Sequence, residues 1–210
     1  MNLSLPKNPG IITHAVILGA FCTGYGVMLA LTDHVTVSDI AVRTMEDLQS
    51  SLTKVLPASI HDNNPVTDKI VLKNEEGKDI TIYRAFKGST LTGVAYEIRG
   101  KGYAGPINLM LGVDAEGKVL GVRATSHKET PGLGDKIEPE KSNWITRFTG
   151  LSIGNPPKDK WKVKKDGGQF DQFSGATITP RGVVKGVYEG LQLFAKHKGE
   201  ILSVKQGEKS

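Results

Sequence analysis

The hydrophobic pattern of the chain begins with one long apolar stretch. Residues 11–32 contain no Asp, Glu, Lys or Arg, and most of them are aliphatic, aromatic or Gly. As a helix with a rise of about 1.5 Å per residue, this stretch spans roughly 33 Å, enough to cross the hydrocarbon core of a bilayer. A cleaved signal peptide is the alternative, but its apolar region is normally about 7–15 residues long and precedes a small-residue cleavage site. The length therefore favours a retained transmembrane helix over residues 11–32.

The charges that flank this stretch predict its orientation. Lys7 precedes it, and Asp33 follows it immediately. Because basic residues tend to stay on the cytoplasmic side, we expect residues 1–10 in the cytoplasm and residues 33–210 on the other side of the membrane. This outer domain is periplasmic if the membrane is the inner membrane of a Gram-negative cell.

Apolar residues continue at helical spacing beyond the stretch, from Val42 to Val55. Ser38 or Asp39 is a suitable N-cap, and Pro57 is a suitable stop. We therefore expect a second helix that leads away from the membrane.

The middle of the chain has the pattern of an antiparallel sheet. Runs rich in apolar and β-branched residues are separated by short polar segments, and residues 114–117 predict a hairpin turn in which Gly117 supplies a positive φ. Clustered strands with helices before and after them, and no alternating strand–helix rhythm, indicate an α+β fold with flanking helices. The expected strands are residues 80–86, 92–98, 107–113 and 119–124.

The last third of the chain predicts shorter elements and one long helix. We expect a short helix over residues 141–148 and a strand over residues 161–164. The final helix covers residues 180–198, with Thr179 as its N-cap and Pro180 in its first position. Trp144 and Trp161 are expected to belong to the core.

Composition excludes several classes of function. A net charge of +5 and a patch of Lys residues between positions 158 and 165 indicate a solvated basic face, and no nucleic-acid-binding module is readable. The single cysteine, Cys22, excludes an intrachain disulfide and a cysteine-held iron–sulfur cluster. We expect neither a metal site nor a nucleic-acid partner.

One segment has the chemistry of a phosphate site. The small residues Ser174, Gly175, Ala176 and Thr177 precede the start of the final helix directly. The first N–H groups of a helix and its positive dipole end stabilise a phosphate group, and a threonine hydroxyl there can lie beside the phosphate or be esterified to it. An ordinary turn and helix cap explain the same spacing.

A second segment separates these interpretations through a resemblance. Ser174–Thr177 resembles the flavinylation motif of the FMN-binding domain family, which includes the RnfG and NqrC subunits of two related respiratory complexes. Residues 127–137 are similar to the other flavin-contacting stretch of that family. Lys128 and the run of residues 178–181 resemble RnfG more than NqrC, and the resemblance covers essentially the whole chain.

The resemblance implies a set of cofactor-binding residues. In this family the last threonine of the motif carries FMN through a phosphoester bond, which maps to Thr177. The resemblance gives no catalytic residue to the chain, and His127 is a weaker candidate that can simply end a strand. The implied FMN-binding residues are Thr177, Ser174, Gly175, Ala176, Glu129, Thr130, Leu133 and Gly134.

The resemblance also implies a function. It predicts an electron-carrier subunit of a membrane-bound, ion-translocating ferredoxin:NAD oxidoreductase, with Rnf subunits A, B, C, D and E as partners and a flavin transferase acting during maturation. Two alternatives remain open. One is an NqrC-like subunit of a Na⁺-translocating NADH:quinone reductase. The other is a tethered, non-redox module that binds an exchangeable phosphate ligand. Arg181 and Lys185 either neutralise the phosphate or lie on a solvated face.

Overall fold

The first helix is longer than the sequence pattern predicts. The computed structural model describes residues 10–73, 77 and 79–203, which form two compact units, residues 1–47 and 48–210. Helix α1 runs without interruption over Ile11–Val55, and Ile11–Val37 is long and apolar enough to cross a membrane, with a mean hydropathy of 1.8. The expected start of a separate helix at Ser38 or Asp39 is therefore wrong. Neither Gly nor Pro occurs there, and one N-cap residue alone does not interrupt a helix.

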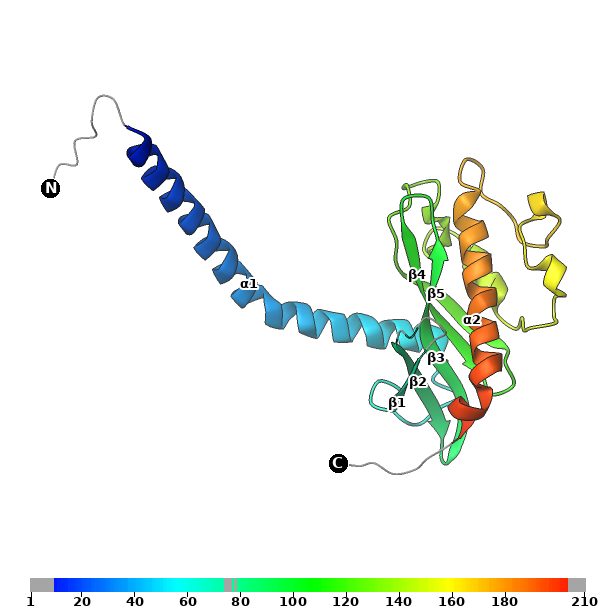
Figure 1. Ribbon diagram of the computed structural model, residues 1–210. Coiled ribbons are helices and arrows are strands. Elements are labelled where there is room, and N and C mark those ends of the chain that lie inside the picture. Colours follow the sequence, from blue (N-terminus) through cyan, green and yellow to red (C-terminus); the bar gives the residue numbers. More distant parts are fainter. Residues whose placement is uncertain (1–9, 74–76, 78, 204–210) are drawn as a thin grey trace. The chain divides into compact units, whose positions relative to one another are not determined.

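A five-stranded antiparallel sheet forms the centre of the second unit (Figure 1). Its strand order follows the chain, β1-β2-β3-β4-β5. The four expected strands are confirmed, each slightly longer than predicted, and β1 is an additional edge strand. The strands are β1 (Lys69–Lys73), β2 (Asp79–Lys87), β3 (Thr90–Lys101), β4 (Pro106–Asp114) and β5 (Val119–Ser126).

The predicted hairpin joins β4 and β5. Oδ1 of Asp114 accepts hydrogen bonds from the backbone N–H groups of Glu116, Gly117 and Lys118, at 3.0, 2.8 and 2.8 Å. Gly117 has a φ of +101°, a backbone conformation that a residue with a side chain would adopt only with strain. One carboxylate thus satisfies the donors of the whole turn.

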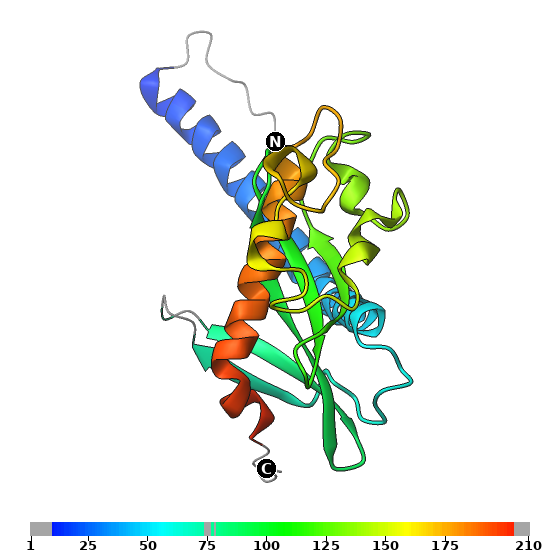
Figure 2. The same cartoon turned by 90° about the vertical axis from the view of Figure 1, so that its right-hand side faces the viewer.

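Both faces of the sheet carry buried side chains. Alternate residues of β3 and β4 point to opposite sides and so belong to two different cores. Tyr96 and Leu111 share one core with Val187 and Leu191 of helix α2 (Ile178–Leu202), which covers this face (Figure 2). The neighbouring residues Ala95 and Met110 pack instead with Leu52, Val55 and Leu56, which belong to or follow the last turns of α1.

A row of glycines allows α2 to approach β3 closely. Gly182, Gly186 and Gly190 lie one helical turn apart, on the side of α2 that faces the strand. A Cβ atom at Gly186 would stand 2.8 Å from the carbonyl oxygen of Arg99, and one at Gly182 would overlap that of Lys101. Because no side chain separates the two backbones, the start of α2 has a fixed position on the sheet.

Between β5 and α2 the chain forms short 3-10 turns held by aromatic side chains. Trp144 and Trp161 are buried, as expected, and Phe148 lies between them in one aromatic cluster. The expected strand over residues 161–164 is wrong, because Val163 makes only one isolated bridge, to Phe170. The predicted helix over residues 141–148 is a 3-10 helix. The four turns are η1 (Asp135–Ile137), η2 (Asn143–Phe148), η3 (Lys158–Lys160) and η4 (Lys164–Asp166).

Candidate functional site

The two segments singled out in the sequence lie side by side in the structure. A Cβ atom placed on Gly175 would stand 3.3 Å from Cδ2 of Leu133, so the turn before α2 touches the loop after β5. Gly175 has a φ of +79°, a conformation that glycine adopts without strain. The fold therefore brings residues 127–135 and 171–180 together at one end of α2.

Helix α2 begins earlier than its sequence suggests and has a different cap. Thr177 occupies the N-cap position, with φ −69° and ψ −24°, and its side chain makes no capping hydrogen bond. Thr179, the expected N-cap, lies inside the helix and is completely buried. The Thr177 side chain is thus half-buried at the helix start, and its hydroxyl is free of the role that a capping threonine normally has.

A buried carboxylate joins three segments beneath this helix start. Glu129 is only 6% exposed. Its Oε1 accepts hydrogen bonds from the backbone N–H groups of Tyr103 and Ala104, at 2.9 and 3.2 Å, and its Oε2 accepts one from the hydroxyl of Thr179. The β3–β4 turn, the loop after β5 and the first turn of α2 are therefore held together by one side chain.

Gly134 makes this arrangement possible. A Cβ atom there would stand 2.8 Å from Cβ of Glu129 and 2.9 Å from Oγ1 of Thr179. A residue with a side chain at this position would push the loop away from the helix. The direct contacts of Glu129 and Gly134 are with protein groups, and their contact with a cofactor stays a prediction.

The remaining expected site residues are accessible. Ser174, Gly175 and Thr130 are exposed, and Ala176 is half-buried. Leu133 is 41% exposed. These positions leave one side of the two segments open to a ligand.

The structure adds two apolar residues that sequence reasoning missed. Tyr103, held through its backbone by Glu129, is 75% exposed, and Ile178, next to Thr177, is 44% exposed. Tyr103 shares the carboxylate of Glu129 with Thr179 in the first turn of α2, and Ile178 belongs to the same turn. Tyr103 is separated from Thr177 by a large part of the domain in sequence, so no local pattern connects the two residues.

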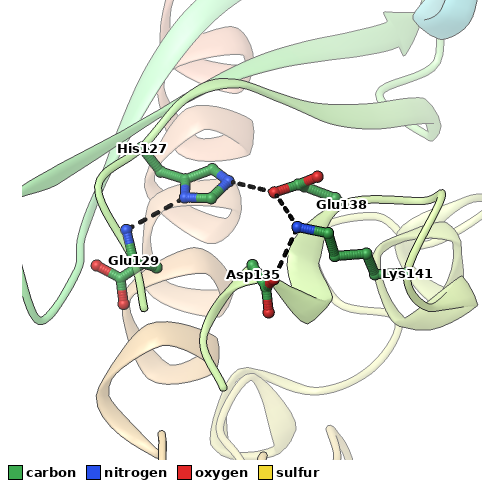
Figure 3. Close-up of polar contacts among 5 residues, drawn as sticks. All are labelled: His127, Glu129, Asp135, Glu138 and Lys141. Atoms are coloured by element: carbon green, nitrogen blue, oxygen red, sulfur yellow. Dashed lines mark hydrogen bonds and ion pairs between the residues drawn. The ribbon is translucent and has the colours of Figure 1, made fainter. Parts of the chain in front are cut away.

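A chain of polar contacts runs behind the loop (Figure 3). Nζ of Lys141 lies 2.7 Å from Oδ2 of Asp135 and 3.1 Å from Oε1 of Glu138. The same Oε1 lies 3.1 Å from Nε2 of His127, whose Nδ1 accepts a hydrogen bond from the backbone N–H of Glu129. The ammonium group of Lys141 lowers the pKa of Asp135 below its usual range.

The basic residues near the helix start are paired with carboxylates. Nε and Nη2 of Arg181 each lie 2.6 Å from an oxygen of Asp166, and this bidentate contact lowers the pKa of Asp166. Lys185 lies 3.6 Å from Glu189 on the exposed side of α2. In the part of the chain that the structure describes, no group of three His, Cys, Asp or Glu side chains is arranged for a metal ion.

Comparison with known proteins matches this region to a flavin-binding family. The sequence model of the FMN-binding domain matches residues 102–192, which include every expected cofactor-binding residue. The G subunit of the ion-translocating oxidoreductase complex of Cereibacter sphaeroides is 46% identical over 192 residues, covering 91% of this chain and 88% of that protein. The corresponding subunit of Stutzerimonas stutzeri is 46% identical over 182 residues, covering 87% and 80%. The crystal structure of Shewanella oneidensis NqrC is similar with a TM-score of 0.49, at 19% identity, covering 73% and 74% of the two chains.

Proposed function

The chain belongs to the family of G subunits of the ion-translocating oxidoreductase (Rnf) complex, and we propose that it is an electron-carrier subunit with FMN esterified to Thr177. The observation that carries this proposal is the Thr177 hydroxyl, which lies at the start of α2 without a capping hydrogen bond. A hydroxyl committed to its own helix would be a poor acceptor for a phosphoryl group. This one is available.

The surroundings of Thr177 fit both ends of FMN. The first N–H groups of α2 have no side-chain cap, and together with the helix dipole they favour a phosphate at this position. Exposed apolar side chains of Tyr103, Leu133 and Ile178 provide a surface for a flat aromatic ring. Thr130 is exposed in the same loop as Leu133 and can offer its hydroxyl to a polar edge of the cofactor.

Attachment requires a phosphoryl-group transfer with a separate enzyme. In the proposed step Oγ1 of Thr177 forms a bond to the FMN phosphorus of FAD, the pyrophosphate bond breaks and AMP leaves. The hydroxyl proton passes to a base of the transferase. Because the turn at Ser174 and Gly175 is exposed, the transferase can reach Thr177 in the folded domain.

The bound flavin would supply one-electron exchange, and the protein would position it. The phosphoester leaves the isoalloxazine ring unmodified, so burial and hydrogen bonds from the protein must tune its potential. The Gly-x-Gly-x-x-Gly pattern of residues 100–105 joins strands β3 and β4, whereas a nicotinamide site has this turn between a strand and a helix. We therefore assign the chain a relay role between the other subunits, A to E, of a ferredoxin:NAD oxidoreductase.

The proposed membrane arrangement follows from the apolar half of α1. A membrane-spanning segment over residues 11–32 would anchor the chain, with residues 1–10 in the cytoplasm and residues 33–210 in the periplasm. The length and composition of Ile11–Val37 and the membrane-complex relatives support one span. The orientation rests on Lys7, which lies outside the described residues.

A denaturing gel tests covalent attachment directly. The wild-type band should fluoresce as a flavin after denaturation, and its intact mass should exceed the sequence mass by one FMN less one water. Thr177→Ala should lose both signals. A flavin that remains on Thr177→Ala would disprove the assignment of the acceptor and make Thr179 the next residue to test. A wild-type protein whose flavin leaves on denaturation would favour an exchangeable phosphate ligand.

A further inference from the structure

We infer that His127 is a positioning residue for the proposed flavin site: it holds the backbone of Glu129 through an unprotonated Nδ1, and protonation of its ring releases that hydrogen bond. The effect of His127 on the flavin rests on the proposed function, because Glu129 belongs to the loop that faces the start of α2. The tautomer of His127 follows from the geometry alone.

The tautomer of His127 follows from its two partners. Nδ1 lies 3.2 Å from the backbone nitrogen of Glu129, with the N–H directed at it. A backbone amide always donates, so Nδ1 must accept and carry no proton. The proton of the neutral ring is therefore on Nε2, which donates to Oε1 of Glu138 at 3.1 Å.

The same polar chain holds both ends of the loop (Figure 3). Oε1 of Glu138 also accepts from Lys141, and Lys141 donates in turn to Asp135. His127 lies at one end of the loop that carries Thr130, Leu133 and Gly134, and Asp135 lies at the other end. A change in the protonation of His127 therefore acts on the end of the loop that carries Glu129.

Protonation of His127 reverses the contact with Glu129. The imidazolium ring carries a hydrogen on Nδ1, which then points at the N–H of Glu129, and two donors face each other. The hydrogen bond from Nε2 to Glu138 remains and becomes an ion pair. The hydrogen bond between Nδ1 and the N–H of Glu129 is lost, and the side chain of Glu129 transmits any movement of the loop to Tyr103 and Thr179.

A charged cleft gives protons access to the ring. The cleft has a volume of about 390 Å³ and is lined by the end of α1, the end of β5 and the turn after η1. Lys54, Arg123, Glu138 and Glu140 line this cleft together with His127. Lys141 contacts Glu138, and Lys128 follows His127 in the chain.

The tautomer is tested without flavin, on full-length Thr177→Val protein in detergent with ¹⁵N-labelled histidine. At high pH the Nδ1 resonance of His127 should be that of an unprotonated ring nitrogen, and Nε2 that of a protonated one. As the ring is protonated, the amide resonance of Glu129 should shift in a one-proton transition. His127→Gln should abolish this transition. A proton on Nδ1 in the neutral ring, or an unchanged Glu129 transition in His127→Gln, would overturn the inference even if the flavin assignment is correct.

The effect on the flavin is tested on the covalently loaded, full-length protein. Flavin fluorescence should show the same one-proton transition in the wild type and lose it in His127→Gln. Glu138→Gln keeps an acceptor for Nε2 but removes the charge, so the transition should move to lower pH and remain otherwise intact. His197→Gln is the matched control and should leave the transition unchanged, because Nδ1 of His197 lies 3.3 Å from Glu200 of its own helix, near the far end of α2. Equal transitions in His127→Gln and the wild type would contradict the positioning role.

Discussion

The hydroxyl of Thr179, in the first turn of α2, donates a hydrogen bond to the carboxylate of Glu129, 50 positions earlier in the chain. Two residues before it, Thr177 has no side-chain hydrogen bond within the helix start. Two threonines of one helical turn thus have separable tasks. One fixes the helix to the loop, and the other offers its hydroxyl to a ligand.

This separation predicts opposite outcomes for two isosteric substitutions. Thr179→Val leaves the buried Oε2 of Glu129 without its donor and should lower the free energy of unfolding by about 1–3 kcal/mol. The covalent flavin should remain, because Thr177 is intact. Thr177→Val should change stability by less than about 0.5 kcal/mol and abolish covalent flavin. Urea unfolding and in-gel flavin fluorescence measure the two properties, and equal destabilisation by both substitutions would contradict the division of tasks.

The difference between Thr177 and Thr179 also shows where sequence reasoning stops. Thr179 before Pro180 is the better local cap, yet its hydroxyl binds a carboxylate that no local rule connects to it. The strands were predictable because runs rich in apolar and β-branched residues, separated by short polar segments, appear directly in the sequence. The strand expected at residues 161–164 is wrong because Trp161 packs in an aromatic cluster and Val163 makes one isolated bridge to Phe170 instead of pairing along a strand.

The site was predictable to the extent that its residues are adjacent in the chain. Motif resemblance named the loop of Glu129 and the turn of Thr177, and the structure brings these two segments into contact, while their binding of FMN stays a prediction. Tyr103 and the contact between His127 and Glu138 were not predictable, since they depend on how the β3–β4 turn and the η1 turn pack on that loop.

The glycine row of α2 predicts a strong position effect. Gly182→Ala places a methyl group on the carbonyl oxygen of Lys101, and the helix cannot move away without disturbing the core. We expect a loss of about 1–3 kcal/mol in unfolding free energy, together with reduced flavin incorporation, because the helix start shifts. Gly199→Ala in the same helix meets no atom within 4 Å and should stabilise by up to about 1 kcal/mol. Similar thermal midpoints for the two variants would argue against close backbone packing at Gly182.

The contact between Asp135 and Lys141 predicts a dependence on pH. Lys141 lowers the pKa of Asp135 in the folded protein. The ionised carboxylate therefore stabilises the folded protein at pH values above the ordinary pKa of aspartate, which is about 4. That stability is lost as the pH falls through the lowered value. Lys141→Met should therefore destabilise most near neutral pH, and its deficit should shrink once Asp135 is protonated. Lys185→Met, which removes an exposed pair with Glu189, is the control and should show no such trend in urea unfolding between about pH 3 and 7.

The proposed topology predicts which fusions are active. A reporter enzyme that works only outside the cytoplasm, joined after Ser210, should be active, and a reporter that works only in the cytoplasm should be inactive at the same position. The reverse pattern in well-expressed fusions would invert the orientation inferred from Lys7. The junction follows Ser210, beyond the end of α2 at Leu202.

The relay role predicts that the isolated subunit accepts electrons but does not complete a reaction. The Gly-x-Gly-x-x-Gly pattern of residues 100–105 lies between two strands rather than between a strand and a helix, and the sequence has a single cysteine, too few for a cysteine-held cluster. Chemical reductants should therefore bleach the flavin of the purified protein, while NADH with an artificial acceptor should give no turnover near the rate of the whole complex. In the assembled complex, Thr177→Val should stop electron transfer between NADH and ferredoxin and spare partial reactions of the cytoplasmic subunits. Gly199→Ala complexes provide the matched control and should keep full activity. NADH oxidation by the isolated, flavin-loaded subunit at the rate of the complex would identify an autonomous dehydrogenase and exclude a pure relay.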